Sequence, residues 1–316
     1  MKPLHIAVGV VSDAGGRILI SERKPDCAYA GQWEFPGGKC EPGEPVTAAL
    51  ARELREELSL TVRAARPLIR LEHRYPDRHV LLDTWRVTAW EGVPEARENQ
   101  RFAWVPATEL DRYPMLAANR PIVRAVQLPE TYLITPAPGR DRDAFVAALA
   151  HSLAAGVRLV RLRAPALAVD DYAALASRCL AACRQEGARL LLDRDPGLVE
   201  RLGADGLHLD ARTAARLRAR PLAAGRLFAV SCHDGTELEQ ALALDADFAV
   251  LGPLAATPSH PGQAGIGWSA FVRLVGERPL PVYGIGGLQP QDLDTAWRHR
   301  AQGIAAIRGL WRPAMG

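Results

Sequence analysis

Three glutamates, Glu53, Glu56 and Glu57, stand within five residues of one another shortly after a pair of glycines. Leucines recur every four residues through the same stretch, so a helix over residues 45–58 would carry a buried stripe. At 100° per residue the three glutamates fall in an arc roughly 100° wide beside that stripe. The spacing therefore predicts that the three carboxylates face one place at the edge of the buried stripe.

Carboxylates crowded in this way need a counter-charge. Two ionised carboxylates ~5 Å apart repel by roughly 3 kcal/mol at an effective dielectric constant of about 20. A hard divalent cation such as Mg²⁺ binds carboxylate oxygens and keeps positions for water and for phosphate oxygens. A solvated helix face with pairs such as Arg52–Glu56 is the alternative, and the helix alone leaves both interpretations open.

The loop before this helix, FPGGK at 35–39, lets the backbone approach a metal or a phosphate closely, because glycine adopts conformations that other residues avoid. Loop and helix together resemble the Nudix box: a glycine, five residues, a glutamate, seven residues, then Arg-Glu-apolar-x-Glu-Glu-x-Gly-apolar. The matching residues are Gly38, Glu44, Arg52, Glu53, Leu54, Glu56, Glu57 and Leu60. Ser59 replaces the last glycine, which ends the helix in a left-handed turn, so we expect mild strain there.

The resemblance extends over residues 1–128, which look like the MutT type of Nudix hydrolase, the 8-oxo-dGTP diphosphatases. It is carried by IAVGVV, EFPGGK, YPDRH, WEG and ANRPIV. It implies cleavage of a nucleoside triphosphate to the monophosphate and pyrophosphate, a reaction of nucleotide-pool sanitisation that serves DNA repair and replication. It also implies Mg²⁺, with Mn²⁺ as a substitute, bound by the Gly37 carbonyl, Glu53, Glu56, Glu57 and Glu98. The implied readers of the base are Arg23, Phe35, Asp77, Arg78 and Asn119.

The chemistry of these side chains agrees with that reaction, because phosphoryl transfer depends mainly on positioning and charge neutralisation. Glu53 can ligate metal and help to deprotonate water, while Arg52 orients it and Glu44 completes the catalytic group. Lys39 can hold a phosphate as a point charge. Asn119 carries both donor and acceptor atoms and can read a purine edge.

Ordinary structural roles remain open for several of these residues. An asparagine before Arg-Pro, such as Asn119, often caps a helix, and Phe35 beside a proline is commonly a core residue. Arg23 and Arg78 are of a type that is usually solvated. Glu98 lies in the polar stretch EARENQ, where any acid could stand.

From residue 131 onward the pattern changes to short apolar runs that alternate with alanine-rich helical stretches. The runs are TYLIT, VRLVRL, ARLLL, DGLHL, RLFAV, DFAVL, LPVYGI and GIAAI. Eight strands separated by helices indicate a (β/α)₈ barrel. The predicted fold is thus an α+β Nudix fold over residues 1–128, followed by an α/β TIM barrel of the (β/α)₈ type over 129–316.

The barrel half resembles thiamine phosphate synthase and its relative TenI, a thiazole tautomerase. The matching segments are YLITP, LVRLR, LLLDR, GADGLHLD, VSCHD, VLGP and VYGIGG. Candidate residues for a thiamine-related phosphate or for proton transfer are Arg163, Asp193, His233, Gly286 and Gly287. Tight turns explain the two glycines equally well, and a structural role explains the histidine equally well.

Departures from the synthase pattern argue against synthase activity. Arg161, Arg163 and Pro165 stand where the synthase has Gln-x-Arg-x-Lys, Thr213 replaces a metal-binding acid, and His260 replaces a lysine. A diphosphate needs cations and metal. Two other hypotheses therefore stay open: a Nudix domain that hydrolyses a thiamine-precursor diphosphate beside its pathway partner, and a barrel that only binds a phosphorylated metabolite.

Composition narrows the class of protein further. The net charge is +3 and the chain has no block of basic residues, so we expect neither a nucleic-acid partner nor an anionic membrane surface. No apolar run approaches the ~18 residues of a spanning helix, and the apolar start lacks a signal-peptide cleavage site. Five cysteines without a CxxC pair predict reduced thiols in a cytoplasmic protein.

Overall fold

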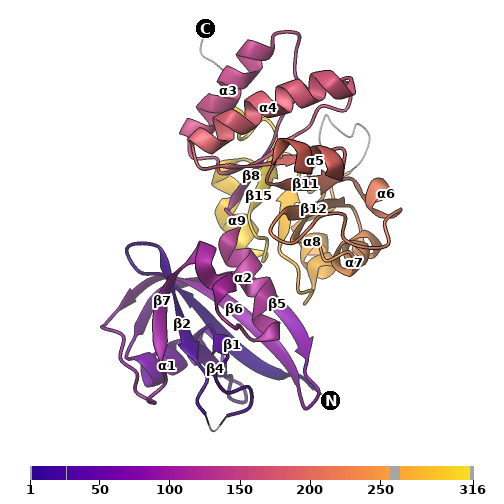
Figure 1. The fold of residues 1–316 in the computed structure, drawn as a ribbon. Coiled ribbons are helices and arrows are strands. Elements are labelled where there is room, and N and C mark those ends of the chain that lie inside the picture. The colour runs from indigo at the N-terminus through magenta and orange to yellow at the C-terminus, as the bar shows by residue number, and fades with distance from the viewer. Residues whose placement is uncertain (1, 26, 257–263, 314–316) are drawn as a thin grey trace. The chain divides into compact units, whose positions relative to one another are not determined.

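The structure, a computed structural model, describes residues 2–25, 27–256 and 264–313, so His260 lies outside the described residues. It divides into two compact units: Met1–Leu128 with Gly276–Pro281, and Pro129–Val275 with Val282–Gly316. Figure 1 labels their helices and strands. Within the described ranges, no helix is both long enough and apolar enough to span a membrane.

Two sheets form the first unit. The larger has the order β4-β1-β6-β5, with β1 parallel to β6 and antiparallel to β4, and the smaller has the order β3-β2-β7. The larger sheet consists of β1 (Leu4–Val11), β4 (Gly37–Lys39), β5 (Thr61–Arg74) and β6 (His79–Glu91). The smaller sheet consists of β2 (Arg17–Glu22), β3 (Trp33–Glu34) and β7 (Phe102–Pro106). This is the predicted α+β arrangement.

Helices α1 (Val46–Leu58) and α2 (Arg120–Gln127) complete this unit, with two 3₁₀ turns, η1 (Ala107–Arg112) and η2 (Ala117–Asn119). Side chains of a strand alternate between its two faces, and β1 uses both. Ala7 and Val11 join the hydrophobic cluster that contains α1, whereas Val8 and Val10 join the one that contains α2. The strand therefore carries a core on each face.

The end of α1 confirms the expectation for Ser59, which adopts a left-handed conformation with φ of 59°. Its N–H donates to the carbonyl of Arg55, and the N–H of Leu60 donates to the carbonyl of Leu54. Glycine is the usual residue at such a helix end. Serine keeps the same turn although a non-glycine residue there is strained.

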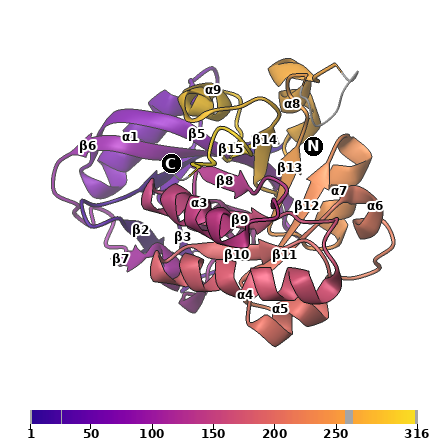
Figure 2. The same cartoon turned by 90° about the horizontal axis from the view of Figure 1, so that it is seen from above.

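The second unit is a closed barrel of eight parallel strands in the order β10-β11-β12-β13-β14-β15-β8-β9. Figure 2 shows helices around these strands. All eight predicted runs form barrel strands: β8 (Thr131–Ile134), β9 (Leu159–Leu162), β10 (Arg189–Leu192), β11 (Gly206–Leu209), β12 (Leu227–Cys232), β13 (Phe248–Leu251), β14 (Val282–Ile285) and β15 (Ile304–Ala306). The (β/α)₈ prediction is confirmed.

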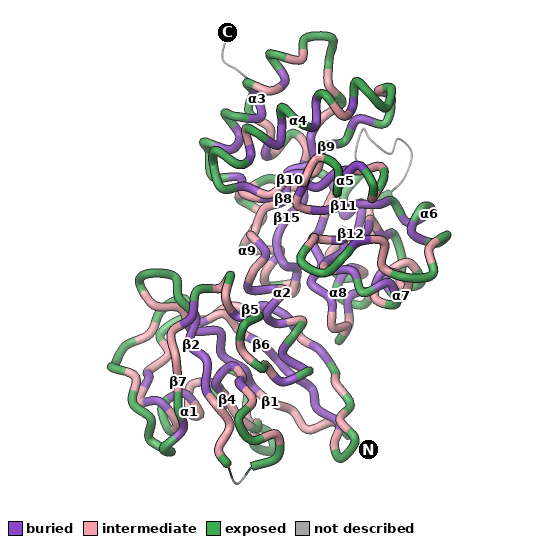
Figure 3. Tube along the Cα trace, in the orientation of Figure 1, coloured by how far each residue is buried: buried purple, intermediate pink, exposed green. Residues whose placement is uncertain are grey.

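Helices connect successive strands: α3 (Arg142–Ala154), α4 (Val169–Gln185), α5 (Pro196–Leu202), α6 (Ala211–Ala214), α7 (Gly235–Ala243), α8 (Gly267–Val275), and η3 (Pro290–Asp292) with α9 (Leu293–Arg298). Tyr132, Phe248 and Tyr283 are fully buried and their rings lie 5.3–5.8 Å apart. Because β8 and β13 are not neighbours in the sheet, the contact between their rings crosses the barrel interior. Figure 3 shows the buried residues concentrated on the strands.

Candidate active site

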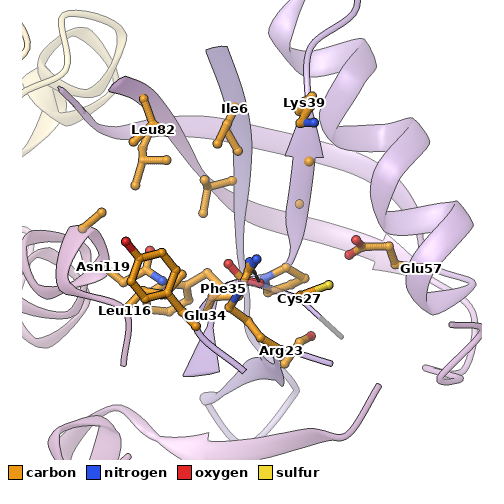
Figure 4. Close-up of a pocket in the computed structure, with 18 of the residues that line it drawn as sticks. Ile6, Arg23, Cys27, Glu34, Phe35, Lys39, Glu57, Leu82, Leu116 and Asn119 are labelled. Atoms are coloured by element: carbon orange, nitrogen blue, oxygen red, sulfur yellow. Dashed lines mark hydrogen bonds and ion pairs between the residues drawn. The ribbon is translucent and has the colours of Figure 1, made fainter. Parts of the chain in front are cut away.

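A pocket of about 370 Å³ opens in the first unit, lined from β1, β2, β4, β6, α1 and η2. Figure 4 shows Asn119 and Phe35 at one end and Glu57, which projects from α1, at the other. Apolar side chains line much of the wall: Leu4, Ile6, Val8, Val80, Leu82, Leu116 and Ala118. An apolar wall with a few polar groups is the usual form of a small-molecule site.

Two buried residues predicted to read the base lie at the apolar end. Phe35 and Asn119 line the pocket and are 3% and 4% exposed. Asn119 stands at the N-cap position of α2, yet its side chain makes no capping hydrogen bond. The amide therefore does not have the capping role that the sequence left open. Its donor and acceptor atoms suit recognition of a heterocycle edge.

Arg23 also lines the pocket, where it is paired with a carboxylate and its side chain is 21% exposed. Its Nη1 lies 2.6 Å from Oε1 of Glu34, and its Nε donates to the carbonyl of Ala28 at 2.8 Å. Burial raises the pKa of the Glu34 carboxyl, against the effect of the Arg23 charge. Sequence reasoning missed Glu34, although it lies within the quoted EFPGGK motif.

An aromatic group lines another part of the pocket. The rings of Tyr29 and Tyr75 lie 5.1 Å apart, and the guanidinium of Arg78 lies 5.8 Å and 5.9 Å from their centroids. These distances are those of cation–π contacts. Asp77 pairs with Arg78 at 2.9 Å, but Asp77 itself does not line the pocket. Neither tyrosine was predicted, because they are far apart in the sequence and only the fold makes them neighbours.

The opposite end of the pocket is acidic. Glu57 lies there, and Glu98, Gly37 and Lys39 also line the pocket. Burial raises the pKa of Glu57 to about 8, and the charges of Glu53 and Glu98 contribute to that rise, while a backbone hydrogen bond from Gly37 opposes it. Glu98 also pairs with Lys24 at 2.8 Å. All four residues, Gly37, Lys39, Glu57 and Glu98, were predicted for one site, and all four line this pocket.

Arg52 forms hydrogen bonds with two glutamates beside the acidic end of the pocket. Its Nε and Nη2 bind the two oxygens of Glu44 at 3.1 Å and 2.9 Å, and its Nη1 lies 2.8 Å from Oε1 of Glu53. Nη2 also donates to the carbonyl of Lys39 at 3.0 Å. The Glu44 and Glu53 side chains are only 15% and 16% exposed. The planar fork of the guanidinium therefore ties the start of the box, the loop and the helix to one another.

Glu56 differs from the expectation that all three glutamates avoid free solvent. Its side chain is 58% exposed and lies 3.2 Å from Nη1 of Arg52. At 100° per residue Glu56 lies about 160° from the middle of the leucine stripe, against about 60° for Glu57. Glu56, at the far edge of the predicted arc, therefore reaches solvent.

The donor set suits a hard divalent cation. Glu57, Glu98, Glu53 and the Gly37 carbonyl carry oxygen atoms of the kind that could bind such a cation. Burial raises the pKa of Glu57, and the neighbouring charges of Glu53 and Glu98 add to that rise. In the part of the chain that the structure describes, no three acidic, histidine or cysteine side chains converge on one point. Glu53 is turned to Arg52 and Glu56 to solvent.

The barrel candidates are dispersed. Arg163 is exposed and its backbone N–H donates to Thr135, while His233 pairs with Glu237 at 2.8 Å. Burial raises the pKa of Asp193, whose Oδ1 is buried without a hydrogen-bond partner. Both Gly286 and Gly287 have positive φ, of 118° and 73°. A Cβ on Gly286 would lie 2.6 Å from the backbone nitrogen of Leu254, so packing alone requires that glycine.

The two units resemble two different families of known proteins. A family model described as NUDIX domain matches residues 7–125, and one described as thiamine monophosphate synthase matches residues 131–310. The chain is 39% identical over 123 residues to the 8-oxo-dGTP diphosphatase of Escherichia coli (strain K12), covering 39% of this chain and 95% of that protein.

Two further relatives show the same division. The CTP pyrophosphohydrolase of Escherichia coli (strain K12) is 33% identical over 125 residues, which are 40% of this chain and 92% of that protein. The thiamine-phosphate synthase of Thermus thermophilus is 33% identical over 180 residues, which are 56% of this chain and 86% of that protein.

Proposed function

Because the chain belongs to the Nudix family over residues 7–125 and to the thiamine monophosphate synthase family over residues 131–310, we propose that its first domain hydrolyses 8-oxo-dGTP to 8-oxo-dGMP and pyrophosphate. The domain is a Nudix hydrolase. Mg²⁺ is the proposed cofactor, Mn²⁺ its substitute, and the proposed location is the cytoplasm.

One observation carries the proposal: a single pocket joins a site for a heterocycle to an acidic site for phosphates. Figure 4 shows Asn119 and Phe35 at one end of the pocket and Glu57 at the other, and Glu98 and Lys39 also line the pocket. A base and the phosphates attached to it can therefore occupy both ends at once. The shape and the polar groups suit a nucleotide better than a free base or free phosphate.

At the base end the roles follow from chemistry. The Phe35 ring offers a flat apolar contact to a base. The Asn119 amide can accept one hydrogen bond and donate another, as an oxidised purine edge requires. Arg23 is held in place by its bonds to Glu34 and to the Ala28 carbonyl, so little conformational freedom is lost when it contacts a substrate.

At the phosphate end the reaction adds water to a phosphorus atom and breaks the anhydride bond between the α and β phosphates. Glu53, Glu57, Glu98 and the Gly37 carbonyl are the groups that would hold Mg²⁺, which when bound neutralises phosphate charge and acidifies water. Glu53 accepts a proton of the attacking water. Arg52 holds the Glu53 carboxylate in one orientation. Lys39 attracts a phosphate oxygen.

The test compares kcat/KM for 8-oxo-dGTP, dGTP, CTP and an aminopyrimidine diphosphate with the full chain. We expect 8-oxo-dGTP to be preferred over dGTP, and Glu53→Gln to lose turnover by orders of magnitude with an unchanged melting curve. A kcat/KM for 8-oxo-dGTP no higher than that for dGTP would overturn the substrate assignment. A preference for CTP or for the diphosphate would move the substrate to pyrimidines, and near-normal turnover of Glu53→Gln would refute its role.

A further inference from the structure

The loop between β6 and β7, residues 92–101, is fixed to the C-terminal end of α1. The N–H of Glu95 donates to the carbonyl of Leu58, and the N–H of Arg97 donates to the carbonyl of Glu57, each at 3.1 Å. The last carbonyls of a helix have no partner within the helix, so the loop supplies donors that this end of α1 lacks. The loop is therefore held against the turn of α1 that carries Glu57.

The buried residue of this loop is a polar one. Among residues 92–101, all of which the structure describes, only Gln100 is buried, at 8% exposure. Its Oε1 accepts from the N–H of Glu98 at 3.0 Å, and its Nε2 donates to the carbonyl of Glu57 at 3.0 Å. Buried polar groups are generally hydrogen-bonded, and here both ends of the amide are. One side chain thus joins the backbone of Glu98 in the loop to the backbone of Glu57 in the helix.

The backbone turns sharply between Glu98 and Gln100. Asn99 has a φ of 58°, in the left-handed region that asparagine enters more readily than most residues. Its N–H donates to the carbonyl of Ala96 at 3.2 Å. This turn allows the side chain of Gln100 to reach back to the N–H of the residue two positions earlier in the chain.

The two glutamates joined in this way are both proposed to hold Mg²⁺. Both line the pocket, and the charge of Glu98 contributes to the raised pKa of Glu57, so the two carboxylates are near each other. Glu98 also pairs with Lys24, but the two side chains are 47% and 34% exposed, and ion pairs at the surface contribute little. The buried amide of Gln100 is therefore the firmer of the two attachments of Glu98.

We propose that Gln100 is a positioning residue of the metal site, which holds Glu98 and Glu57 at the separation at which both carboxylates bind one divalent cation. Both ends of its amide are bonded to backbone groups, so Gln100 acts through the two glutamates and is not itself a ligand. Residues that orient metal ligands commonly affect metal affinity strongly. The inference rests on the proposed function, because it takes the two glutamates as ligands, and it adds a residue outside the Nudix box.

The experiment measures Mn²⁺ binding to the full chain without nucleotide by isothermal titration calorimetry, beside a thermal melt. Gln100→Met is the test variant, because methionine fills a similar space but lacks the amide. Gln127→Met is the matched control: Gln127 also joins two segments, since its Nε2 donates to the carbonyl of Ala107 and to Asp111, but it does not line the pocket. We expect Gln100→Met to weaken Mn²⁺ binding by about tenfold or more, and Gln127→Met to leave it unchanged.

Gln100→Ala removes the same hydrogen bonds without filling the space, and we expect it to weaken Mn²⁺ binding as well. A lowered melting temperature with unchanged Mn²⁺ affinity in both variants would make Gln100 purely structural and overturn the proposal, as would loss of folding in both. An equal loss of affinity in Gln127→Met would also overturn it. If the unaltered chain binds no Mn²⁺, the metal-dependent hydrolase fails together with this inference, whereas normal affinity in both the unaltered chain and Gln100→Met overturns this inference alone.

Discussion

The carboxylate of Glu53 lies directly against the backbone of Gly38. A Cβ placed on Gly38 would lie 2.2 Å from both Cδ and Oε2 of Glu53, closer than any real contact. The φ of Gly38 is not positive, so its backbone conformation does not by itself require glycine. The second glycine of the loop is needed because the proposed catalytic carboxylate rests on it.

Gly38→Ala should therefore separate activity from stability. The methyl group displaces the end of a flexible side chain, so we expect the melting temperature to change little. Displacing Glu53 by about 1 Å should lower kcat on the order of 100-fold. The measurement is kcat with 8-oxo-dGTP beside a thermal melt. Gly139→Ala is the control, because its Cβ would meet nothing within 4 Å. Unchanged kcat in Gly38→Ala would contradict the role of this contact.

Arg52→Lys should be a severe change although it keeps the charge. Arg52 makes two hydrogen bonds to Glu44 and one to Glu53, and a single ammonium cannot reproduce that fork. We expect kcat to fall by about 10- to 100-fold while KM changes less, because Glu53 loses its orientation. Arg55→Lys, an exposed position of the same helix, should leave both constants unaltered. Equal effects of the two variants would refute the positioning role.

Asn119→Ala should reduce discrimination between oxidised and ordinary guanine. Loss of a bidentate contact costs about 1–3 kcal/mol of base discrimination, so the ratio of kcat/KM for 8-oxo-dGTP to that for dGTP should fall by about 5- to 150-fold. Stability should be nearly constant, since the side chain does not cap α2. A constant ratio together with a lowered melting temperature would instead indicate a purely structural asparagine.

The raised pKa of Glu57 should make the stability of the metal-free protein depend on pH. Its pKa in the folded state is about 8, above the ordinary value of 4.5, so the folded state binds the proton more tightly than the unfolded state. The stability that this carboxyl contributes is fully present below pH 4.5 and is lost as the pH rises through about 8. The side chain of Glu57→Gln cannot titrate. The free energy of unfolding of this variant, relative to that of the unaltered chain, should therefore rise as the pH increases from 4.5 to about 8.

Urea unfolding in EDTA at several pH values measures the difference between the two proteins. Parallel curves for the unaltered chain and Glu57→Gln would contradict the prediction. Addition of Mg²⁺ above pH 8 provides the control: it should raise the melting temperature of the unaltered chain, because a cation bound there would offset the charge of the deprotonated carboxylate. Glu57→Gln should respond less.

The sequence by itself determined the elements and the chemistry of the first site. The leucine stripe of α1 and the eight short apolar runs of the barrel are local patterns, and local patterns follow from backbone geometry. The Nudix box placed Arg52, Glu53 and Glu57 in one motif before any contact was known. The spacing of residues along α1 also explains why Glu56 is exposed, because it places Glu56 on the far side of the helix from the leucines.

Tertiary structure alone decided which distant side chains meet. Arg23 pairs with Glu34, Tyr29 packs on Tyr75, and Glu98 pairs with Lys24 across 74 residues. In the barrel, closure of the sheet brings Arg161 to Ser231, although 70 residues separate them in the chain. A contact between residues far apart in the chain depends on the path of everything between them, and no spacing along the sequence carries that information.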